Sequence, residues 1–264
     1  MKKTGIAMNS SVRAVVVMVL VCVGVAAQAG DYYVTTNGTG KGTSWNDPTN
    51  NLQGAVTACP AGYKVLVSNG VYTSASVNSS VVTINKSMEL RGVSGNPADV
   101  TLDGSGTNRG VYVSLTSTGY VLIAGFTITN CSASDMMGGG IRIYHGTITA
   151  GTAEVQNCVI AGNTTRAAVV YGGGGGIHSI AAAASSVFLT SVSNCTIAGN
   201  TAFREGGGGA FFYWGRVIMQ DCRILGNTAN DGTRGMGGGI CAYYNTTEPF
   251  AKLLNWPELR GVRG

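Results

Sequence analysis

Carboxylates and histidines are the residues of this chain that could perform acid, base or metal chemistry. In the repetitive part they are spread at one or two per repeat, at Asp135, Glu154, Glu205, Asp221 and Asp231, with histidines at His145 and His178. A general acid and base pair, or a set of calcium ligands, needs several such groups close together. The spacing therefore favours a protein without a catalytic centre. Glu205 and Asp231 are the candidate catalytic acids of the alternative, an enzyme.

Aromatic and basic residues recur at fixed distances after four glycine runs. The runs end at the anchors Ile141, Ile177, Ala210 and Ile240. If each anchor points inward from a strand, the positions one and three residues later point outward, because side chains alternate along a strand. The aromatic and basic residues at these positions, and at the position four residues after an anchor, form what we call the aromatic ridge: Arg142, Tyr144, His178, Tyr213, Trp214, Tyr243 and Tyr244. Flat exposed rings can stack on sugar rings, and the other interpretation is that they pack beneath loops.

The elements that must position this ridge come from a sequence repeat. Residues 157–165, 194–202 and 221–229 are nearly identical, and the four anchors follow one another at intervals of 36, 33 and 30 residues. Units of this length stack into a solenoid, because none can bury an apolar face alone. Within a unit small apolar residues stand two apart, as Cys158 and Ile160 do, which is the period of a strand. We therefore predict an all-β fold, a parallel β-helix with one strand per face in each coil.

Asparagine recurs at one bend of the predicted coils, at Asn163, Asn200 and Asn227. Adjacent coils of a β-helix lie about 4.8 Å apart, so amides at one register position can hydrogen-bond along the axis. We expect these three residues to form an asparagine ladder. An earlier and less regular unit places Cys131 at the same position.

The first 29 residues have the character of a secretory signal peptide. Basic residues precede an apolar run over 14–27, and Ala27-Gln28-Ala29 before Gly30 fits a small-x-small cleavage site. The run is shorter than the roughly 20 apolar residues that span a membrane, which makes a membrane anchor the weaker interpretation. We predict that residues 1–29 are a signal peptide, that the protein is secreted or at the surface of a bacterium, and that it meets the membrane only during export.

Charge argues against nucleic acid as a partner. The chain has 17 basic and 12 acidic residues, and three of the basic residues lie before residue 30. The remaining net charge is too small for the basic surface that phosphate backbones require. Charged residues make up 11% of the chain and glycines number 41, a composition suited to tight turns and stacked polar residues.

The cysteines predict neither a metal site nor a cofactor site. Cys158, Cys195 and Cys222 share one register position, so we interpret them as a buried column of small side chains, although a secreted chain with six cysteines is also compatible with disulfides. No CxxC or Cys/His spacing suggests a metal. The glycine runs lack the Lys-Ser/Thr of a phosphate-binding loop, and no cofactor is predicted.

Four segments are predicted along the chain. Residues 30–60 hold a strand near 31–34 and a helix near 51–59, which would cover the open strand edge of the first coil. Residues 61–247 form the β-helix. The tail over 248–264 has neither period nor turn residues, and we expect it to be irregular, as the end of a truncated repeat array.

Several motifs resemble the secreted right-handed parallel β-helix proteins of pectin-lyase-like fold, over roughly residues 31–245. They are YYVTTNG at 32–38, TSW at 43–45, VLVSNGVYT at 65–73, LDGSG at 102–106 and GFTITN at 125–130. The repeats also resemble those of polymorphic outer-membrane proteins, with Ile-x-Gly-Asn in place of Phe-x-x-Asn. Enzymes of the pectin-lyase-like fold cut acidic polysaccharides, but the paired-Asp and Gly-His-Gly signatures of the polygalacturonase group are absent here.

The sequence thus favours an exported β-helix scaffold, similar to an adhesin, that binds extracellular or cell-wall polysaccharide at the aromatic ridge without catalysis. The alternative is a polysaccharide lyase or glycoside hydrolase of the same fold. A third possibility is a structural spacer that has no ligand.

Overall fold

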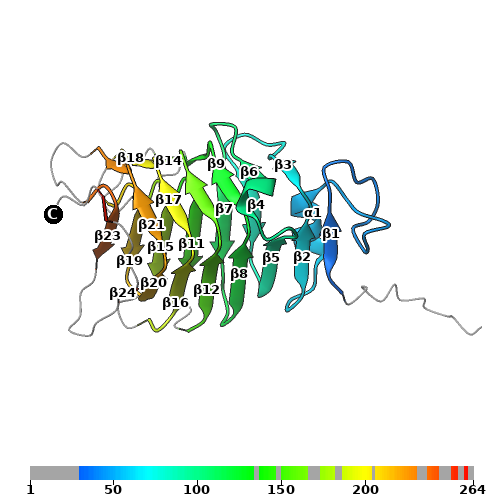
Figure 1. The fold of residues 1–264 in the computed structure, drawn as a ribbon. Helices are drawn as coiled ribbons and strands as arrows, with labels where there is room; N and C mark the ends of the chain where they lie inside the picture. Colours follow the sequence, from blue (N-terminus) through cyan, green and yellow to red (C-terminus); the bar gives the residue numbers. More distant parts are fainter. Residues whose placement is uncertain are drawn as a thin grey trace, which may run out of the picture.

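A computed structural model describes residues 30–133, 137–146, 150–165, 173–181, 186–203, 206–230 and 237–243, and the backbone alone of 251–254 and 259–260. These residues wind into an elongated stack of coils, with β1 and α1 at one end and β23 near the other (Figure 1). The strands of successive coils pair in parallel. The predicted parallel β-helix is confirmed.

Each coil contributes one short strand to each of three long sheets. Sheet A contains β1 (Tyr32–Val34), β2 (Lys64–Val67), β5 (Met88–Gly92), β8 (Tyr120–Ala124), β12 (Thr152–Gln156), β16 (Leu189–Ser193), β20 (Arg216–Gln220) and β24 (Ala251–Leu254). Sheet B contains β3 (Gly70–Tyr72), β6 (Val100–Asp103), β9 (Thr127–Thr129), β13 (Val159–Ala161), β17 (Thr196–Ala198), β21 (Arg223–Leu225) and β25 (Leu259–Arg260). Sheet C, which carries the candidate site, contains β4 (Ser80–Ile84), β7 (Arg109–Ser114), β11 (Ile141–His145), β15 (Ile177–Ala181), β19 (Ala210–Tyr213) and β23 (Ile240–Tyr243).

Two smaller features complete the coils. A narrow fourth sheet, sheet D, follows the bend after sheet B and contains β10 (Ser132–Ala133), β14 (Thr164–Thr165), β18 (Thr201–Ala202) and β22 (Thr228–Ala229). A short 3-10 helix, η1 (Pro97–Asp99), leads into β6.

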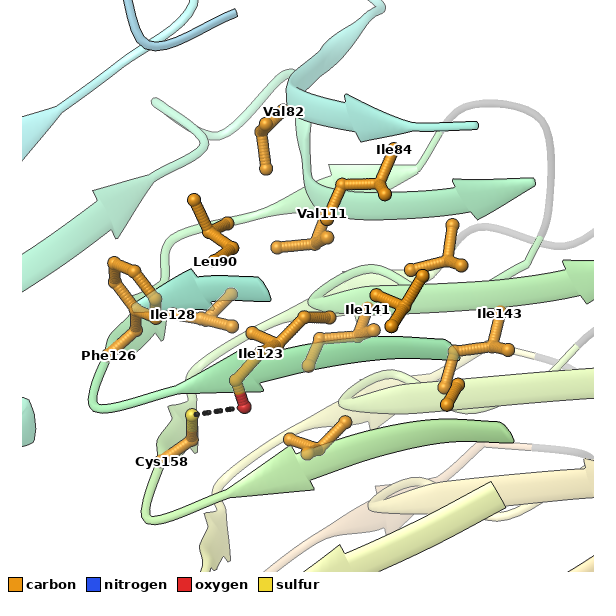
Figure 2. Packing of buried hydrophobic residues seen from close by; sticks show 14 of the residues in the cluster. Val82, Ile84, Leu90, Val111, Ile123, Phe126, Ile128, Ile141, Ile143 and Cys158 are labelled. Atoms are coloured by element: carbon orange, nitrogen blue, oxygen red, sulfur yellow. Dashed lines mark hydrogen bonds between the residues drawn. The ribbon is translucent and has the colours of Figure 1, made fainter. Parts of the chain in front are cut away.

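One apolar core runs along the inside of the stack. Alternate residues of sheets A, B and C point into it, and those of neighbouring coils lie directly over one another (Figure 2). The thiol of Cys158 lies among them, with its Sγ 3.8 Å from the carbonyl oxygen of Ile123. Phe126 occupies the equivalent position one coil earlier, and both side chains are buried. The inward positions of sheet C fix which of its residues face outward.

The expected asparagine ladder is present at the bend between sheets B and D. The Nδ2 of Asn163 donates to the Oδ1 of Asn200 at 3.0 Å, and the Nδ2 of Asn200 donates to the Oδ1 of Asn227 at 2.9 Å. Each amide also donates to a carbonyl of the preceding coil, as Asn200 does to Ile160 at 2.8 Å. Cys131 takes the fourth position, and its backbone N–H donates to the Oδ1 of Asn163 at 3.0 Å. The ladder satisfies buried polar groups that the turn would otherwise leave unpaired.

The stacked cysteines are free thiols. Cys158, Cys195 and Cys222 are buried in successive coils, and Sγ of Cys195 lies 3.1 Å from the carbonyl oxygen of Ser193. Their interpretation as a column of small buried side chains is confirmed.

A helix covers the first coil, as expected. The helix α1 (Leu52–Ala58) begins after Asn51, whose Oδ1 accepts from the N–H of Gly54 at 2.8 Å. Its apolar face, Leu52, Ala55 and Val56, is buried against the end of the stack. This cap shields apolar groups of the first coil from water.

The end of the chain differs from the expectation of an irregular tail. Within 248–264, residues 251–254 form β24, which pairs with β20, and residues 259–260 form β25, which pairs with β21. An existing parallel strand presents an unpaired row of peptide groups, so it can order the next segment even when that segment lacks the repeat's apolar period.

Candidate functional site

The glycine runs set the register of sheet C. Ile141 pairs with Ile177, Ile177 with Ala210 and Ala210 with Ile240, so the predicted alignment of the anchors is confirmed. The backbones of neighbouring runs lie in close contact, and a Cβ added to Gly140 would lie 2.6 Å from the carbonyl oxygen of Gly176. A side chain at this position would push the coils apart.

The residues one and three positions after the anchors, which include most of the ridge, lie in two parallel rows on the outer face of sheet C. The first row holds Arg142, His178, Phe211 and Cys241, and the second holds Tyr144, Ile180, Tyr213 and Tyr243. In the second row Tyr144 and Tyr213 are half-buried and Tyr243 is 38% exposed. Tyr244 lies outside the described residues. The accessible part of the ridge is therefore the second row together with Arg142 and Trp214, which are also half-buried.

His178 lies at the expected register position but does not reach solvent. Its exposed fraction is 0%, and its neighbours in the first row are the large side chains of Arg142 and Phe211. The ring centroids of His178 and Phe211 are 5.4 Å apart. Alternation along the strand predicted the register position of His178. Whether a residue at this position reaches solvent depends on the size of the side chains in neighbouring coils, and here they cover the ring. His178 therefore contributes to packing and not to the exposed surface.

Aromatic rings make consecutive contacts at the C-terminal end of the ridge. The rings of Tyr213 and Tyr243 stack with centroids 5.3 Å apart, and the ring of Trp214 lies 4.5 Å from that of Tyr213. Trp214 has a left-handed backbone, with φ of 59°, and its N–H donates to the carbonyl of Tyr243 at 3.2 Å. Its indole N–H has no acceptor among the residues that the structure describes. This turn places the indole beside the second row.

Two residues that the sequence analysis missed extend the ridge toward the N-terminus. Tyr112 pairs with Arg142 across β7 and β11, and it therefore belongs to the first row. The guanidinium carbons of Arg109 and Arg142 each lie 5.2 Å from the centre of the Tyr112 ring, and Arg142 also lies 5.5 Å from the Tyr144 ring. Gly110-Val111, a reduced form of the glycine run and anchor, was the sequence signal for this coil.

A cleft of about 220 Å³ lies at this end of the ridge, and we call it the Arg109 cleft. Arg109 is 6% exposed, and it donates from Nε to the carbonyl of Gly138 and from Nη2 to that of Met137, both at 2.9 Å. The other lining residues are small or carry a hydroxyl, an amide or an aromatic ring: Asn78, Ser79, Ser80, Thr83, Thr107, Tyr112, Ser132 and Ala133. The cleft thus offers hydrogen-bonding groups beside an aromatic wall.

A comparison with protein families identifies the architecture independently. The family model described as right handed beta helix region matches residues 109–249, which include both rows of the ridge. The chain belongs to the right-handed β-helix family. Searches of the curated proteins and of the solved structures gave no match.

The candidate catalytic acids of this β-helix protein, Glu205 and Asp231, lie outside the described residues. Among the described acids, Glu89 accepts from Nε of Arg91 at 2.6 Å and lies 3.7 Å from Nζ of Lys64.

A second acid on the outer face of sheet A is also engaged. Glu154 accepts from the hydroxyl of Tyr120 at 3.0 Å. Burial, together with this hydrogen bond, raises the pKa of Tyr120 to about 12. Glu89 and Glu154 face the same outer side with Leu122 between them in register, so they are separated by two strand spacings, about 9.6 Å. Each carboxylate on this face is therefore held by a neighbouring side chain, on a different sheet from the ridge.

The described residues provide neither a metal-binding cluster nor a membrane-spanning helix. Within the described parts of the chain, no three histidines, cysteines or acids are grouped so that they could hold a metal ion. The same residues include no helix with the length and apolar character to cross a bilayer.

Proposed function

We propose that this β-helix protein is an exported scaffold that binds polysaccharide along the outer face of sheet C and does not cleave it. The observation that carries the proposal is the second row of the ridge, where Tyr144, Tyr213 and Tyr243 recur at one register position of the coils. Ile180 takes this position in the coil between Tyr144 and Tyr213, so three of four successive coils carry a ring. Rings aligned along one axis suit an extended ligand better than a compact one.

The two kinds of side chain on this face have different roles in binding. Aromatic faces stack on the apolar faces of sugar rings without a fixed hydrogen-bond pattern. Arg142 lies over the rings of Tyr112 and Tyr144, an arrangement that orients its guanidinium for sugar hydroxyls or carboxylates. The Arg109 cleft, with its hydroxyl groups, would receive one end of the bound chain.

The arrangement of the acids supports binding over catalysis. Glu89 is engaged with Arg91 and Lys64, and Glu154 with Tyr120, so these carboxylates hold cationic or phenolic neighbours. They also lie on sheet A rather than beside the ridge. A polysaccharide lyase or glycoside hydrolase remains the alternative function, with Glu205 and Asp231 as its candidate acids.

The proposed partner is an extracellular or cell-wall polysaccharide, and the proposed location is outside the cytoplasm of a bacterium. The support for export is the signal-like sequence of residues 1–29. The small net charge of the remaining chain supports neither nucleic acid nor a membrane surface as the partner.

One experiment separates binding from cleavage. The protein is applied to an array of plant and bacterial glycans, and each glycan that it retains is then incubated with the protein and assayed for reducing ends and unsaturated products. We expect retention on a subset of glycans and no product. Product formation that depends on Glu205 or Asp231 would establish the enzyme, and failure to retain any glycan would favour a spacer.

A further inference from the structure

A groove of about 670 Å³ lies at the N-terminal end of the stack, between α1, β4 and the loop that follows β3, and we call it the hydroxyl groove. Eight of its fifteen lining residues carry a hydroxyl, three carry an amide and none is charged. Apolar contact comes chiefly from Val71, which is 58% exposed, and from Leu52 of the capping helix. The groove thus combines many uncharged polar groups with a small apolar surface.

Part of this hydrogen-bonding capacity is not used within the protein. The side chains of Thr73 and Ser76, both exposed in the loop after β3, form no hydrogen bond among the residues that the structure describes. Within the same residues, the hydroxyls of Ser79 and Ser80, where β4 begins, also form none. These four hydroxyls can therefore donate to, and accept from, a bound molecule.

The walls of the hydroxyl groove are held in place by the protein itself. Gln53 ties α1 to β4, because its Oε1 accepts from the N–H of Thr83 at 2.6 Å and its Nε2 donates to the carbonyl of Thr83 at 3.2 Å. The N–H of Ser79 donates at 2.8 Å to Oδ1 of Asn108, which is 2% exposed. A groove that is formed in advance lowers the entropic cost of binding.

The hydroxyl groove is continuous with the proposed polysaccharide surface. Ser79, Ser80 and Thr83 line both this groove and the Arg109 cleft. Thr83 is the partner of Tyr112 across β4 and β7, so it continues the first row by one coil. A chain that lies along sheet C and enters the Arg109 cleft would therefore meet the groove next.

The lining of the hydroxyl groove favours uncharged sugar residues. Hydroxyls and amides offer both donors and acceptors, which match the hydroxyls of a sugar ring, and Val71 can contact an apolar face of the ring. A carboxylate or sulfate would lose water in the groove without meeting an opposite charge. Arg109 lines the cleft but not the groove, so the two cavities differ in charge.

We propose that the hydroxyl groove binds neutral sugar residues at the end of the polysaccharide that reaches the Arg109 cleft. This subsite rests on the proposed function and extends it. Sugars along the ridge meet aromatic rings and Arg142, whereas sugars in the groove meet only uncharged groups. The subsite therefore discriminates against a chain that is charged at every residue.

The test titrates the full chain with hexasaccharides of cellulose, xylan and mannan and with hexagalacturonate, by calorimetry and by NMR shifts of the groove amides. T73V/S76A removes two hydroxyls that line the groove but not the Arg109 cleft. S191A/S193A is the matched control, because it removes two hydroxyls from the outer face of sheet A. We expect at least one neutral hexasaccharide to shift the amide signals of the groove. It should bind T73V/S76A about fivefold more weakly, or weaker still, and the control like the parent.

Several results would overturn the subsite. They are no binding of any neutral hexasaccharide at millimolar concentration, equal affinity of T73V/S76A and the parent, and hexagalacturonate that shifts the groove amides as strongly as the neutral chains do. Y213S/Y243S separates the subsite from the ridge. A hexasaccharide whose affinity falls in Y213S/Y243S but not in T73V/S76A supports the ridge and contradicts the subsite. The reverse result supports the subsite and contradicts the ridge.

Discussion

The rings of Tyr213 and Tyr243 are stacked on the outer face of sheet C, with an interplanar angle of 8° and centroids 5.3 Å apart. The two residues are direct partners across β19 and β23, so the register of the β-helix brings the rings together. Because the glycine runs set that register, a backbone feature determines the spacing of the aromatic surface. A change that shifts the register of the coils would therefore also separate the stacked rings of the proposed binding face.

Replacing Asn200 by aspartate should destabilise the β-helix. Asn200 is 0% exposed, and its Nδ2 donates to the carbonyl of Ile160 and to Oδ1 of Asn227. Aspartate would turn a carboxylate oxygen toward both acceptors, and Oδ1 of Asn227 would keep only the backbone N–H of Asn200 as a donor. We expect the free energy of unfolding to fall by about 1 to 3 kcal/mol, measured by chemical denaturation.

Asn194→Asp is a matched control for this variant. Asn194 lies outside the core with a left-handed backbone, and Asp221 stands at the equivalent position of the next coil with the same φ of 51°. Aspartate is therefore compatible with the backbone of that site. It removes only the exposed hydrogen bond from Nδ2 of Asn194 to Oδ1 of Asn157, 3.1 Å long, so we expect a smaller loss of stability than for Asn200→Asp. Equal stability of Asn200→Asp and the parent would contradict the structural role of the ladder.

This ladder was predictable because its signal is local and repeated. Asn163, Asn200 and Asn227 each stand in the same short sequence, and the fold requires only that the units stack. The hydrogen bonds between the side-chain amide of Gln53 in α1 and the backbone of Thr83 in β4 were not predictable, because Thr83 lies 30 residues away and has no repeated pattern around it. The strands β24 and β25 were missed for a related reason, since pairing with the preceding coil orders them without an apolar period.

His145 should make the protein less stable in mild acid. It is 1% exposed, and its ring stacks on Phe188 with centroids 3.6 Å apart. Burial lowers its pKa from 6.5 to about 3. Between these values the unfolded chain binds a proton that the folded chain does not, so stability decreases as the pH falls below about 6.5. The loss attributable to His145 reaches about 2 kcal/mol at pH 5.

The variant H145F isolates this contribution. Phenylalanine keeps a ring against Phe188 and cannot titrate. Denaturation at pH 7 and pH 5 should show a smaller loss of stability in H145F than in the parent. The same loss in both proteins would mean that His145 is protonated in the folded state.

The thiols of the native protein should react slowly. Burial raises the pKa of Cys131 to about 12 and that of Cys59 to about 11, which disfavours the reactive thiolate. The stacked thiols of Cys158, Cys195 and Cys222 are also covered. We expect Ellman's reagent to modify these five cysteines rapidly only after denaturation. Rapid modification in the native state, or an intact mass that rises on reduction, would contradict the buried free thiols.

The mature protein should begin near Gly30. This prediction rests on the cleavage site Ala27-Gln28-Ala29, which follows an apolar run. Expression in a bacterium, followed by fractionation and N-terminal sequencing, should place a chain that starts at this residue outside the inner membrane. An intact Met1 on a cytosolic protein would contradict export.

The candidate site was predictable in its register and less so in its surface. The anchors and the second row follow from the glycine runs, whose spacing is visible in the sequence. Whether a position in the first row reaches solvent depends on its neighbours in other coils, which is why His178 is buried at the predicted register position. Tyr112 and Arg109 were missed because their coil retains only Gly110 of the glycine run.

The most direct test of the account measures polysaccharide binding by Y213S/Y243S, with affinity electrophoresis against a glycan that the parent protein retains. Serine removes both stacked rings from the outer face of sheet C, while the inward anchors Ala210 and Ile240 and the glycine runs are unchanged. We expect the variant to lose at least about tenfold in affinity, since each ring contributes roughly 0.5 to 1.5 kcal/mol beyond its buried area. Its circular dichroism should keep the β signal of the parent. Unchanged binding by a folded Y213S/Y243S would contradict the account.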